Sequence, residues 1–249
     1  MTAISPGPTW VRVTRPRPAA RLNLICLPFA GGGASRYRDW PDQLPENIAV
    51  VPVQLPGRED RLLEPVVDSM EPLVSRLLAG LAGQLDRPVA LFGHSMGALI
   101  AFELATRLRV LGHEPVHVFV SGCRAPYLPR RSADRHMLPD PEFIASVREL
   151  NGIPPELADN ADFLDLVLPT LRGDFTLVET YRYRDQPPLR CPVSVLGGLG
   201  DSEVSQADLA AWSRHTTGPC QVHLLPGDHF FVDTARPALL RLVSAKLGG

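Results

Sequence analysis

The chain has 249 residues, of which 45% are hydrophobic and 21% charged, and it carries a formal net charge of −2. This composition is typical of a globular domain with a sizeable core, and it excludes a disordered chain and gives no support to nucleic-acid binding. No apolar run approaches the roughly 18 residues of a membrane span, and residues 1–20 lack the hydrophobic core of a secretion signal, so we expect a cytoplasmic protein.

Short apolar runs alternate with amphipathic stretches along the chain. The runs are partly β-branched and bounded by Gly, Pro or polar residues, which predicts buried strands at Leu22–Leu27, Ile48–Val53, Val89–Phe92, Val116–Val120, Val193–Leu196 and Val222–Leu225. The stretches between them have helical spacing, at Met70–Leu85, Ala98–Leu111, Gln206–His215 and Pro237–Leu247. This alternation predicts an α/β fold with a mostly parallel sheet and helices on both faces.

One interval breaks the alternation. Between Ser121 and Val193 the chain runs about 70 residues without a clear strand, and a structureless loop of that length is improbable in a compact domain. We predict a helical lid at about residues 125–188, inserted over the carboxyl edge of the sheet within a single domain of residues 1–249. Its helical patterns are Asp140–Leu150 and Ala161–Leu171, punctuated by Pro154, Pro155, Pro169 and Gly173.

The cysteines show no pattern of a disulfide framework or a metal site. There are four of them, none in a C-x-x-C pair: Cys26, Cys123, Cys191 and Cys220. Thiols within apolar, strand-like runs of a cytoplasmic protein are expected to be buried and free. We therefore expect no disulfide and no metal.

The pentapeptide 93–97 has the sequence G-H-S-M-G and matches G-x-S-x-G. The match alone is weak, because chance produces one in about one chain in ten of this length. Its context is stronger, since it follows the run Val89–Phe92 and precedes the helical stretch from Ala98, which is the strand–turn–helix setting of a nucleophilic serine. We predict Ser95 as a nucleophile; the alternative is a helix N-cap in an ordinary turn.

A serine nucleophile needs a base, and in this architecture the base follows the acid in the chain. His229 lies just after the last predicted strand and before the C-terminal helix, where a base is expected; its alternative is a solvent-exposed loop histidine. The six other histidines lie inside the pentapeptide, before any plausible acid, at a helix end or within a strand: His94, His113, His117, His136, His215 and His223.

The acid is expected to leave the strand before that one. The run Val193–Leu196 leads into a glycine-rich loop that ends in Asp201, from which a carboxylate can reach His229. Glu203 is the nearest rival, and Asp228 is too close to His229 in sequence to orient it easily. A turn or N-cap role is the alternative for Asp201.

Acyl transfer also needs two backbone N–H donors for the tetrahedral oxyanion. One is expected from Met96, directly after the serine, and the other from the loop after the first strand, which has the glycine-rich sequence P-F-A-G-G-G at 28–33. A phosphate-binding role for this loop fails, because no Lys-Ser/Thr follows it and the G-x-G-x-x-G spacing is absent.

These segments together resemble the stand-alone type II thioesterases of polyketide and non-ribosomal peptide synthases, over nearly the whole chain. The most specific motifs are Q-L-P-G-R-E at 54–59 and G-D-H-F-F at 227–231. The resemblance also rests on 27–32, 93–97, 121–126 and 197–201, followed by Leu209 and Trp212. Phe29, Gly33 and Asp228 depart from the family pattern, and none of them is a predicted triad position.

The resemblance implies an α/β-hydrolase fold and a triad of Ser95, Asp201 and His229, with Ala30 and Met96 as oxyanion donors. It implies hydrolysis of aberrant or stalled acyl groups from the phosphopantetheine arm of acyl or peptidyl carrier proteins, in antibiotic-type biosynthesis. The chemistry is a Ser95 acyl-enzyme resolved by water that His229 activates. No cofactor is implied beyond the arm of the substrate, and nothing demands more than a monomer.

Two further features are compatible with a carrier-bound substrate. One face of the lid is apolar and could line an acyl channel or pack on the domain: Phe143, Ile144, Val147, Phe163, Leu164 and Leu168. Arginines near the start of the lid could meet an acidic carrier or the arm's phosphate, or form a solvated face: Arg124, Arg130, Arg131 and Arg135. We name as candidate contacts Phe29, Arg124, Arg130 and Arg131.

The residues by themselves predict acyl transfer by a lidded hydrolase and do not separate a thioester from an ester. A carboxylesterase or lipase on the same fold is therefore one rival. A product-releasing domain of a larger synthase is another, which a start at Met1 and a first strand by Leu22 disfavour. A non-catalytic carrier-binding protein is a third, and a complete Ser, Asp and His in the expected order disfavours it.

Overall fold

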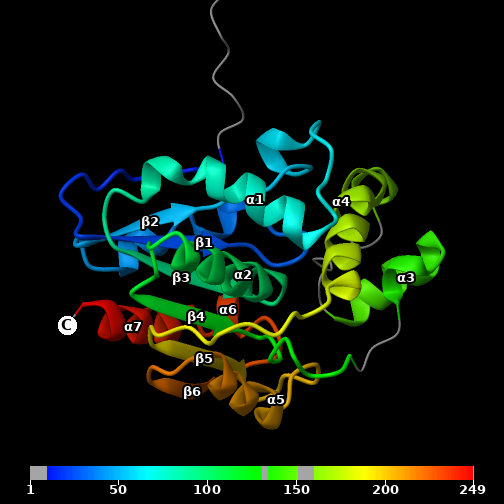
Figure 1. Ribbon diagram of the computed structural model, residues 1–249. Helices are drawn as coiled ribbons and strands as arrows, with labels where there is room; N and C mark the ends of the chain where they lie inside the picture. Colours follow the sequence, from blue (N-terminus) through cyan, green and yellow to red (C-terminus); the bar gives the residue numbers. More distant parts are fainter. Residues whose placement is uncertain (1–9, 131–133, 151–159, 249) are drawn as a thin grey trace, which may run out of the picture.

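The computed structural model describes residues 10–130, 134–150 and 160–248 (Figure 1). One sheet of six parallel strands has the order β2-β1-β3-β4-β5-β6. Every strand predicted from the sequence is present, with small shifts at the ends: β1 Leu22–Leu27, β2 Ile48–Pro52, β3 Val89–His94, β4 His117–Ser121, β5 Val193–Gly198 and β6 Cys220–Leu225. The first five strands are buried along their length, whereas edge strand β6 is half exposed, and this explains its more polar sequence.

Helices cover both faces of the sheet (Figure 1). One core lies under α1 (Met70–Gly80), α2 (Met96–Val110) and α5 (Gln206–Ala210). The other lies under α6 (Phe231–Thr234) and α7 (Arg236–Leu247). The predicted helix 206–215 is α5 followed by a 3-10 helix, and α2 begins at Met96, immediately after the serine of the pentapeptide. No helix in the described ranges has the length and apolar character needed to cross a membrane.

The insertion between β4 and β5 contains a short 3-10 helix, η5 (Arg135–Met137), and two longer helices, α3 (Asp140–Glu149) and α4 (Ala161–Thr180). In Figure 1, α4 lies beside one end of the sheet and α3 lies outside α4. The helical character of the insertion is as expected from the sequence. Pro154 and Pro155 fall outside the described residues.

Helix α4 is longer than the sequence indicated, and the prediction that Pro169 and Gly173 punctuate it is wrong. Proline and glycine cost about 3 and about 1 kcal/mol in a helix interior. Tertiary contacts around these residues outweigh that cost: the Thr170 hydroxyl donates to the carbonyl of Gly57, and a Cβ at Gly173 would lie 2.5 Å from a methyl carbon of Val66. The glycine is therefore needed for close packing.

Candidate active site

Ser95 lies at the sharp turn between β3 and α2. Its backbone has φ 52° and ψ −115°, a strained conformation for a residue with a side chain. The turn requires small neighbours, because a Cβ at Gly93 would lie 2.0 Å from the carbonyl oxygen of Gly97, and one at Gly97 would lie 2.2 Å from that of Leu27. The amide of Ser95 donates to the carbonyl of Ser121 at 2.8 Å. Ser95 makes no side-chain cap hydrogen bond to α2, and this strand–turn–helix geometry is the setting expected for a serine nucleophile rather than for an ordinary N-cap.

His229 and Asp201 are brought together from the loops after β6 and β5. His229 Nδ1 and Asp201 Oδ2 are 2.9 Å apart, and the Asp201 carboxyl is fully buried. Burial by itself would raise the pKa of Asp201, but hydrogen bonds from the His229 ring and from the amides of Glu203 and Val204 outweigh it and hold that pKa below its usual value. The carboxylate stays ionised and fixes the proton on Nδ1, leaving Nε2 as the base.

Ser95 and His229 line the same cavity. Among the described residues no hydrogen bond joins their side chains, and in ligand-free enzymes this contact is often long. The rival acids lie elsewhere: Glu203 Oε2 faces Arg135 at 3.5 Å, and the Asp228 carboxylate accepts from the amide of Phe230. The structure therefore pairs His229 with Asp201 rather than with either rival.

His94 packs against His229, the histidine of this pair. Its ring is completely buried, its Nδ1 lies 2.9 Å from the Ser121 hydroxyl, and its ring centre lies 5.1 Å from that of His229. Burial lowers the pKa of His94 well below its ordinary value, so the ring is neutral. It packs directly against Gly122, where a Cβ would lie 2.5 Å from its Cε1. As expected from the sequence, it does not act on the serine.

The two predicted oxyanion donors, Ala30 and Met96, line the cavity beside Ser95 and His229. Met96 is the first residue of α2, where backbone N–H groups lack helical partners. In the described part of the chain neither Ala30 nor Met96 donates its N–H to an acceptor, so both remain available to a ligand oxygen. All four groups follow β1, β3 or β6, and parallel strands bring their carboxyl ends to one edge of the sheet.

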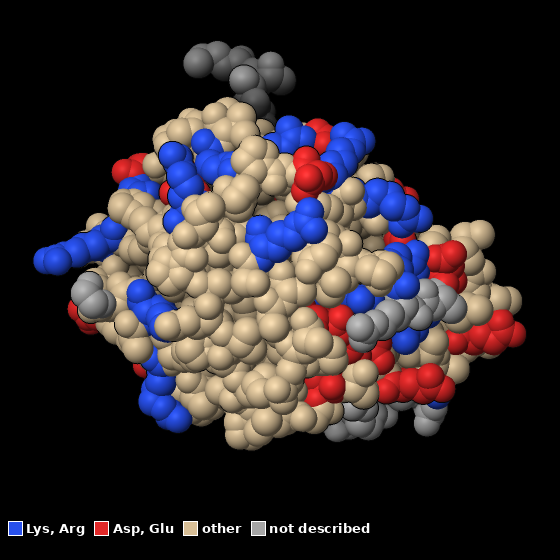
Figure 2. Space-filling model, turned by 60° about the horizontal axis from the view of Figure 1, so that its bottom comes forward, with Lys and Arg blue, Asp and Glu red and all other residues tan. Residues whose placement is uncertain are grey.

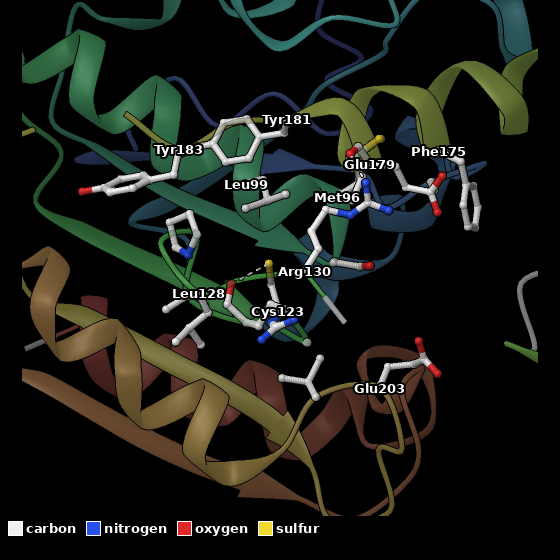
Figure 3. A pocket seen from close by; sticks show the side chains of 18 of the residues that line it. Met96, Leu99, Cys123, Leu128, Arg130, Phe175, Glu179, Tyr181, Tyr183 and Glu203 are labelled. Carbon is white, nitrogen blue, oxygen red and sulfur yellow. Dashed lines mark hydrogen bonds between the residues drawn. The ribbon is translucent and has the colours of Figure 1, made fainter. Parts of the chain in front are cut away.

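The cavity has a volume of about 760 Å³. In Figure 3 the labelled tyrosines and apolar side chains lie at one end, and the labelled charged side chains lie toward the other, together with Phe175. The apolar end comprises Leu99, Cys123, Leu128, Tyr181 and Tyr183, and the charged end includes Arg130, Glu179 and Glu203. Such a shape suits a substrate with an apolar group on one side of the reacting bond and a polar group on the other.

The apolar face of the lid does not form this cavity. Phe143 and Val147 of α3 are buried against α4 in a cluster of their own, so the packing alternative is correct for them and the acyl-channel hypothesis is wrong. Ile144, Leu164 and Leu168 belong to the same cluster. The insertion lines the cavity through other residues, namely Leu150, Phe175, Val178, Tyr181 and Tyr183.

The predicted carrier contacts near the lid are engaged within the chain. Arg124 faces the buried carboxylate of Asp208 at 3.3 Å, and Arg130 pairs with Asp134 at 2.7 Å. Arg131 lies outside the described residues. In the view of Figure 2, positive and negative side chains alternate on the side of α3 and α4 rather than forming a basic patch. These pairs weaken the argument that the arginines are poised for an external anion.

Phe29 is the remaining predicted contact, and it faces a second cavity of about 610 Å³ on the other side of the loop after β1. Its ring packs edge-on against His94 and Phe230, with centroids 5.8 and 5.2 Å away. Phe163 of the insertion lines the same second cavity. Phe29 thus lines the second cavity and is absent from the described lining of the one that contains Ser95.

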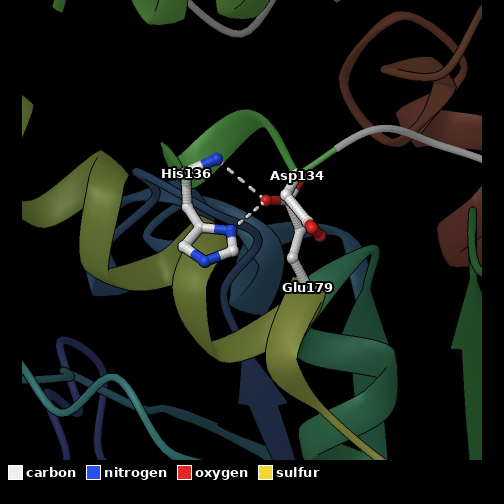
Figure 4. A group of neighbouring side chains, drawn as sticks. All are labelled: Asp134, His136 and Glu179. Carbon is white, nitrogen blue, oxygen red and sulfur yellow. Dashed lines mark hydrogen bonds and ion pairs between the residues drawn. The ribbon is translucent and has the colours of Figure 1, made fainter. Parts of the chain in front are cut away.

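Asp134, His136 and Glu179 form the one described group of side chains with metal-ligand spacing, their ligand atoms lying within 4.8 Å of one another (Figure 4). Glu179 is already saturated, because it accepts from the His136 ring at 2.6 Å and from the amides of Arg135 and His136. Asp134 pairs with Arg130. We interpret the group as the attachment of the segment before α3 to helix α4.

Two features around the site were missed from the sequence. One is the packing of His94 under His229. The other is a buried ion pair between Arg58 and Asp174 beside the loop that follows β1. Arg58 lies within the Q-L-P-G-R-E motif but had no role assigned, and Asp174 lies beyond Leu171, where the predicted helical pattern ended. The charged residue inside that motif was the one available signal.

Comparisons with known proteins identify the family of this chain. The thioesterase domain family matches residues 22–247. The chain is 42% identical to the protein named linear gramicidin dehydrogenase LgrE of Brevibacillus parabrevis (99% of this chain, 95% of the relative) and 38% identical to gramicidin S biosynthesis protein GrsT of Aneurinibacillus migulanus (99% and 97%). The solved structure of the type II thioesterase BorB from the borrelidin biosynthetic cluster is 39% identical, covers 96% of this chain and 97% of its own, and has a TM-score of 0.88. The chain belongs to the thioesterase family of α/β-hydrolases, and its relatives include type II thioesterases.

Proposed function

We propose that this thioesterase releases aberrant or stalled acyl groups from the phosphopantetheine arm of acyl or peptidyl carrier proteins, through an acyl-enzyme on Ser95. The observation that carries the proposal is the convergence of Ser95, the His229–Asp201 pair and two available backbone N–H groups on one cavity of a thioesterase chain. Relatives from non-ribosomal peptide and polyketide pathways, such as the type II thioesterase YbtT of the yersiniabactin pathway, support the substrate class.

The chemistry follows from the positions of these groups. Ser95 Oγ attacks the thioester carbonyl while His229 Nε2 takes its proton, and the ionised Asp201 stabilises the imidazolium. The N–H groups of Ala30 and Met96 bind the oxyanion. Collapse breaks the C–S bond, and the arm's sulfur leaves with the proton from His229. Water, deprotonated by His229, then attacks the acyl-Ser95 ester and regenerates the serine. No cofactor is needed beyond the substrate's own arm.

Cys123 is the other nucleophile that lines the cavity, and its environment disfavours it. Burial raises the pKa of the Cys123 thiol to about 12, so the thiolate is scarce at neutral pH. Among the described residues no histidine is hydrogen-bonded to it, and its thiol donates to the carbonyl oxygen of Arg124 at 3.3 Å. Ser95, with a base in the same cavity, is the better nucleophile.

Hydride transfer is a rival activity to weigh, because the name of the LgrE relative contains the word dehydrogenase. A dinucleotide-binding loop requires G-x-G-x-x-G after a strand, and the glycines after β1 are consecutive, at Gly31, Gly32 and Gly33. The family that the chain matches is a thioesterase family. We therefore do not extend redox chemistry to this chain.

Two experiments test the proposal: a comparison of matched substrates and one substitution. Matched thioesters and oxygen esters of the same acyl group separate a thioesterase from a carboxylesterase, and we expect kcat/KM to favour the carrier-bound thioester. Ser95→Ala should lower kcat by about 10⁵- to 10⁶-fold, as for other serine triads. The exposed Ser213→Ala, which lies outside the cavity, is the matched control. Full activity of Ser95→Ala would reject the mechanism, and a preference for esters would reject the substrate class.

For the arm's phosphate we propose Arg182 in place of the paired arginines. It is exposed and lines the cavity, between Tyr181 and Tyr183 in the sequence. Its described hydrogen bonds go only to the backbone carbonyls of Glu179 and Tyr181, at 3.2 and 3.0 Å. An arginine whose partners are neutral carbonyls loses little when it turns to a phosphate oxygen.

Arg182→Glu should reduce kcat/KM about ten- to a hundredfold on an acyl-phosphopantetheine thioester, because a hydrogen bond to a charged group contributes about 1.5–3 kcal/mol. The same variant should keep its activity on the acyl-pantetheine that lacks the phosphate. Arg184→Glu introduces the same charge two residues away, outside the cavity lining, and is the control. Equal losses on both substrates would contradict a phosphate contact.

Cytoplasmic location and a monomeric state stay predictions.

A further inference from the structure

The most deeply buried ion pair among the described residues joins Arg58, in the loop after β2, to Asp174, in the middle of α4. The pairing is bidentate, with Nη1–Oδ2 and Nη2–Oδ1 distances of 2.8 and 2.7 Å. The two side chains are only 6% and 2% exposed. A bidentate guanidinium–carboxylate pair fixes both partners in distance and in plane, which a surface ion pair does not.

Both partners of this pair also bind the backbone of the loop after β1. The N–H of Gly31 donates to Asp174 Oδ2 at 2.8 Å, and Arg58 Nη1 donates to the carbonyl oxygen of Gly32 at 3.0 Å. These two residues directly follow Ala30. The ion pair therefore holds one N–H and one C=O of the loop that carries the proposed oxyanion donor.

The loop itself has a conformation that needs such support. Gly32 donates its N–H to the Phe29 carbonyl at 2.9 Å, which closes a four-residue turn with Ala30 and Gly31 at its centre. Gly31 has φ +75°, the positive value that the third position of a type II turn requires. Glycine makes the turn accessible but also leaves it free to adopt other conformations, because no Cβ restricts them.

The far end of the loop is held by the same motif that supplies the arginine. Gln54 is fully buried, and its Oε1 accepts the N–H of Ala34 at 2.7 Å. Its Nε2 donates to the carbonyl oxygen of Arg58 at 2.8 Å. Gln54 and Arg58, the first and fifth residues of Q-L-P-G-R-E, thus hold the loop at Ala34 and at Gly32, and Asp174 of α4 holds it at Gly31.

We propose that Arg58 and Asp174 are positioning residues that hold the Ala30 N–H at the point where the oxyanion forms, and that helix α4 is thereby a fixed wall of the catalytic site. The inference rests on the proposed function, since it takes Ser95 as nucleophile and Ala30 as donor. Oxyanion stabilisation depends on donors that are already in place, so a loop released by a few tenths of an ångström loses transition-state binding while still admitting substrate.

The test uses a pair of substitutions that removes the ion pair without leaving a buried charge. Replacing a buried ion pair by apolar residues of similar volume is often neutral for stability, so Arg58→Met combined with Asp174→Leu is expected to fold with a melting temperature near that of the wild type. Its Gly31 N–H and Gly32 C=O nevertheless lose their partners. We expect kcat on an acyl-pantetheine thioester to fall about 10²- to 10³-fold, the usual effect of one lost oxyanion donor, with KM changed less than about threefold.

The matched control is Arg172→Met combined with Asp140→Leu. This pair also links α4 to another element, at 2.5 Å, but it joins α4 to α3 and does not contact the loop after β1. We expect its kcat to stay within about twofold of the wild type. Arg58→Lys, which keeps the charge but loses the planar bidentate fork, should fall between the wild type and the double variant.

A trifluoromethyl ketone analogue of the acyl group gives the second readout, because it binds as a hemiketal oxyanion. The Arg58→Met/Asp174→Leu variant should bind it at least about tenfold more weakly, in contrast to an unchanged affinity for the product acid. A folded double variant with wild-type kcat and wild-type ketone affinity would overturn the inference. If the wild type and Ser95→Ala hydrolyse the thioester equally, the proposed function itself fails. If Ser95→Ala is inactive while the double variant behaves as the wild type, only the positioning role of Arg58 and Asp174 fails.

Discussion

The two helices of the insertion, α3 and α4, are attached to the body of the protein in different ways. Helix α4 is joined to the sheet domain by the buried Arg58–Asp174 pair, by the Thr170 hydroxyl on the carbonyl of Gly57, and through Tyr181, just after its end, to Glu103. Helix α3 packs its apolar side chains on α4 and has an ion pair with it that is largely exposed. In Figure 1, α3 accordingly forms an outer layer.

This difference changes the interpretation of the insertion as a single lid. Parts of a protein held by few buried contacts open locally at low cost, whereas parts tied into the core open only with the whole domain. Helix α4 supplies residues to the cavity wall and holds the loop beside Ser95. If any described helix of the insertion moves, the contacts favour α3.

The largest expected effect comes from breaking the attachment of α4 at one partner. Asp174→Leu leaves the Arg58 guanidinium buried without its carboxylate, which should cost about 3–5 kcal/mol of unfolding free energy. Asp140→Leu at the exposed attachment of α3 should cost about 1 kcal/mol or less. Urea denaturation of the two variants measures both values. Equal losses would show that the two helices are attached with similar strength.

A smaller effect is expected from Phe143→Ala, which removes the ring that packs α3 against α4. Phe143 is completely buried and packs against Phe175, with ring centroids 5.3 Å apart. The loss should be at most about 3 kcal/mol, the lower end for such a truncation, because α3 can undock by itself. Amide hydrogen exchange should accelerate in α3 and stay slow in the second half of α4. Acceleration along the whole of α4 would mean that the two helices open as one unit.

The smallest effect, counted per unit of pH, concerns the body of the protein rather than the insertion. Burial lowers the pKa values of His117 and His215 from 6.5 to about 4, so both rings are neutral in the folded state. Between about pH 6.5 and 4 the unfolded chain binds protons that the folded chain does not, and stability must therefore fall as the pH falls through this window.

His215→Phe isolates the contribution of one of these rings. His215 sits among aromatic rings and its Nε2 has no described partner, so phenylalanine fits its place. The variant should lose up to about 1.4 kcal/mol per pH unit less than the wild type on acidification from pH 6.5 to 4. Thermal unfolding at a series of pH values measures the slopes. An unchanged acid slope would contradict the assignment of a depressed pKa to His215.

The sequence was sufficient for the strands and for the residues that follow them. Ser95, Asp201 and His229 each come within a few residues of the end of a predicted strand, and parallel strands bring such positions to one edge whatever the intervening chain does. The strands themselves and the strand–turn–helix setting of Ser95 followed from local patterns, whereas the order of the strands in the sheet was not predicted. These inferences required no knowledge of which distant side chains meet.

The remainder depends on contacts between distant parts of the chain. Arg58 and Asp174 are 116 residues apart, and no local sequence pattern at either residue indicates that the other is its partner. The continuation of α4 through Pro169 depends on the body that it packs against, which overrides the low helix propensity. The predicted basic cluster failed as a free surface for the same reason, since Arg124 finds its carboxylate, Asp208, in a different element.

The most direct test of the account is to trap the acyl-enzyme. Wild-type protein turning over an acyl-pantetheine thioester is quenched in acid, digested and analysed by mass spectrometry, with Ser95→Ala treated in parallel. The account predicts a mass increase equal to the acyl group on the peptide that contains Ser95, absent from the variant. An acyl group found on Cys123, or turnover with no acylated peptide in a sample shown to retain acyl esters, would contradict it.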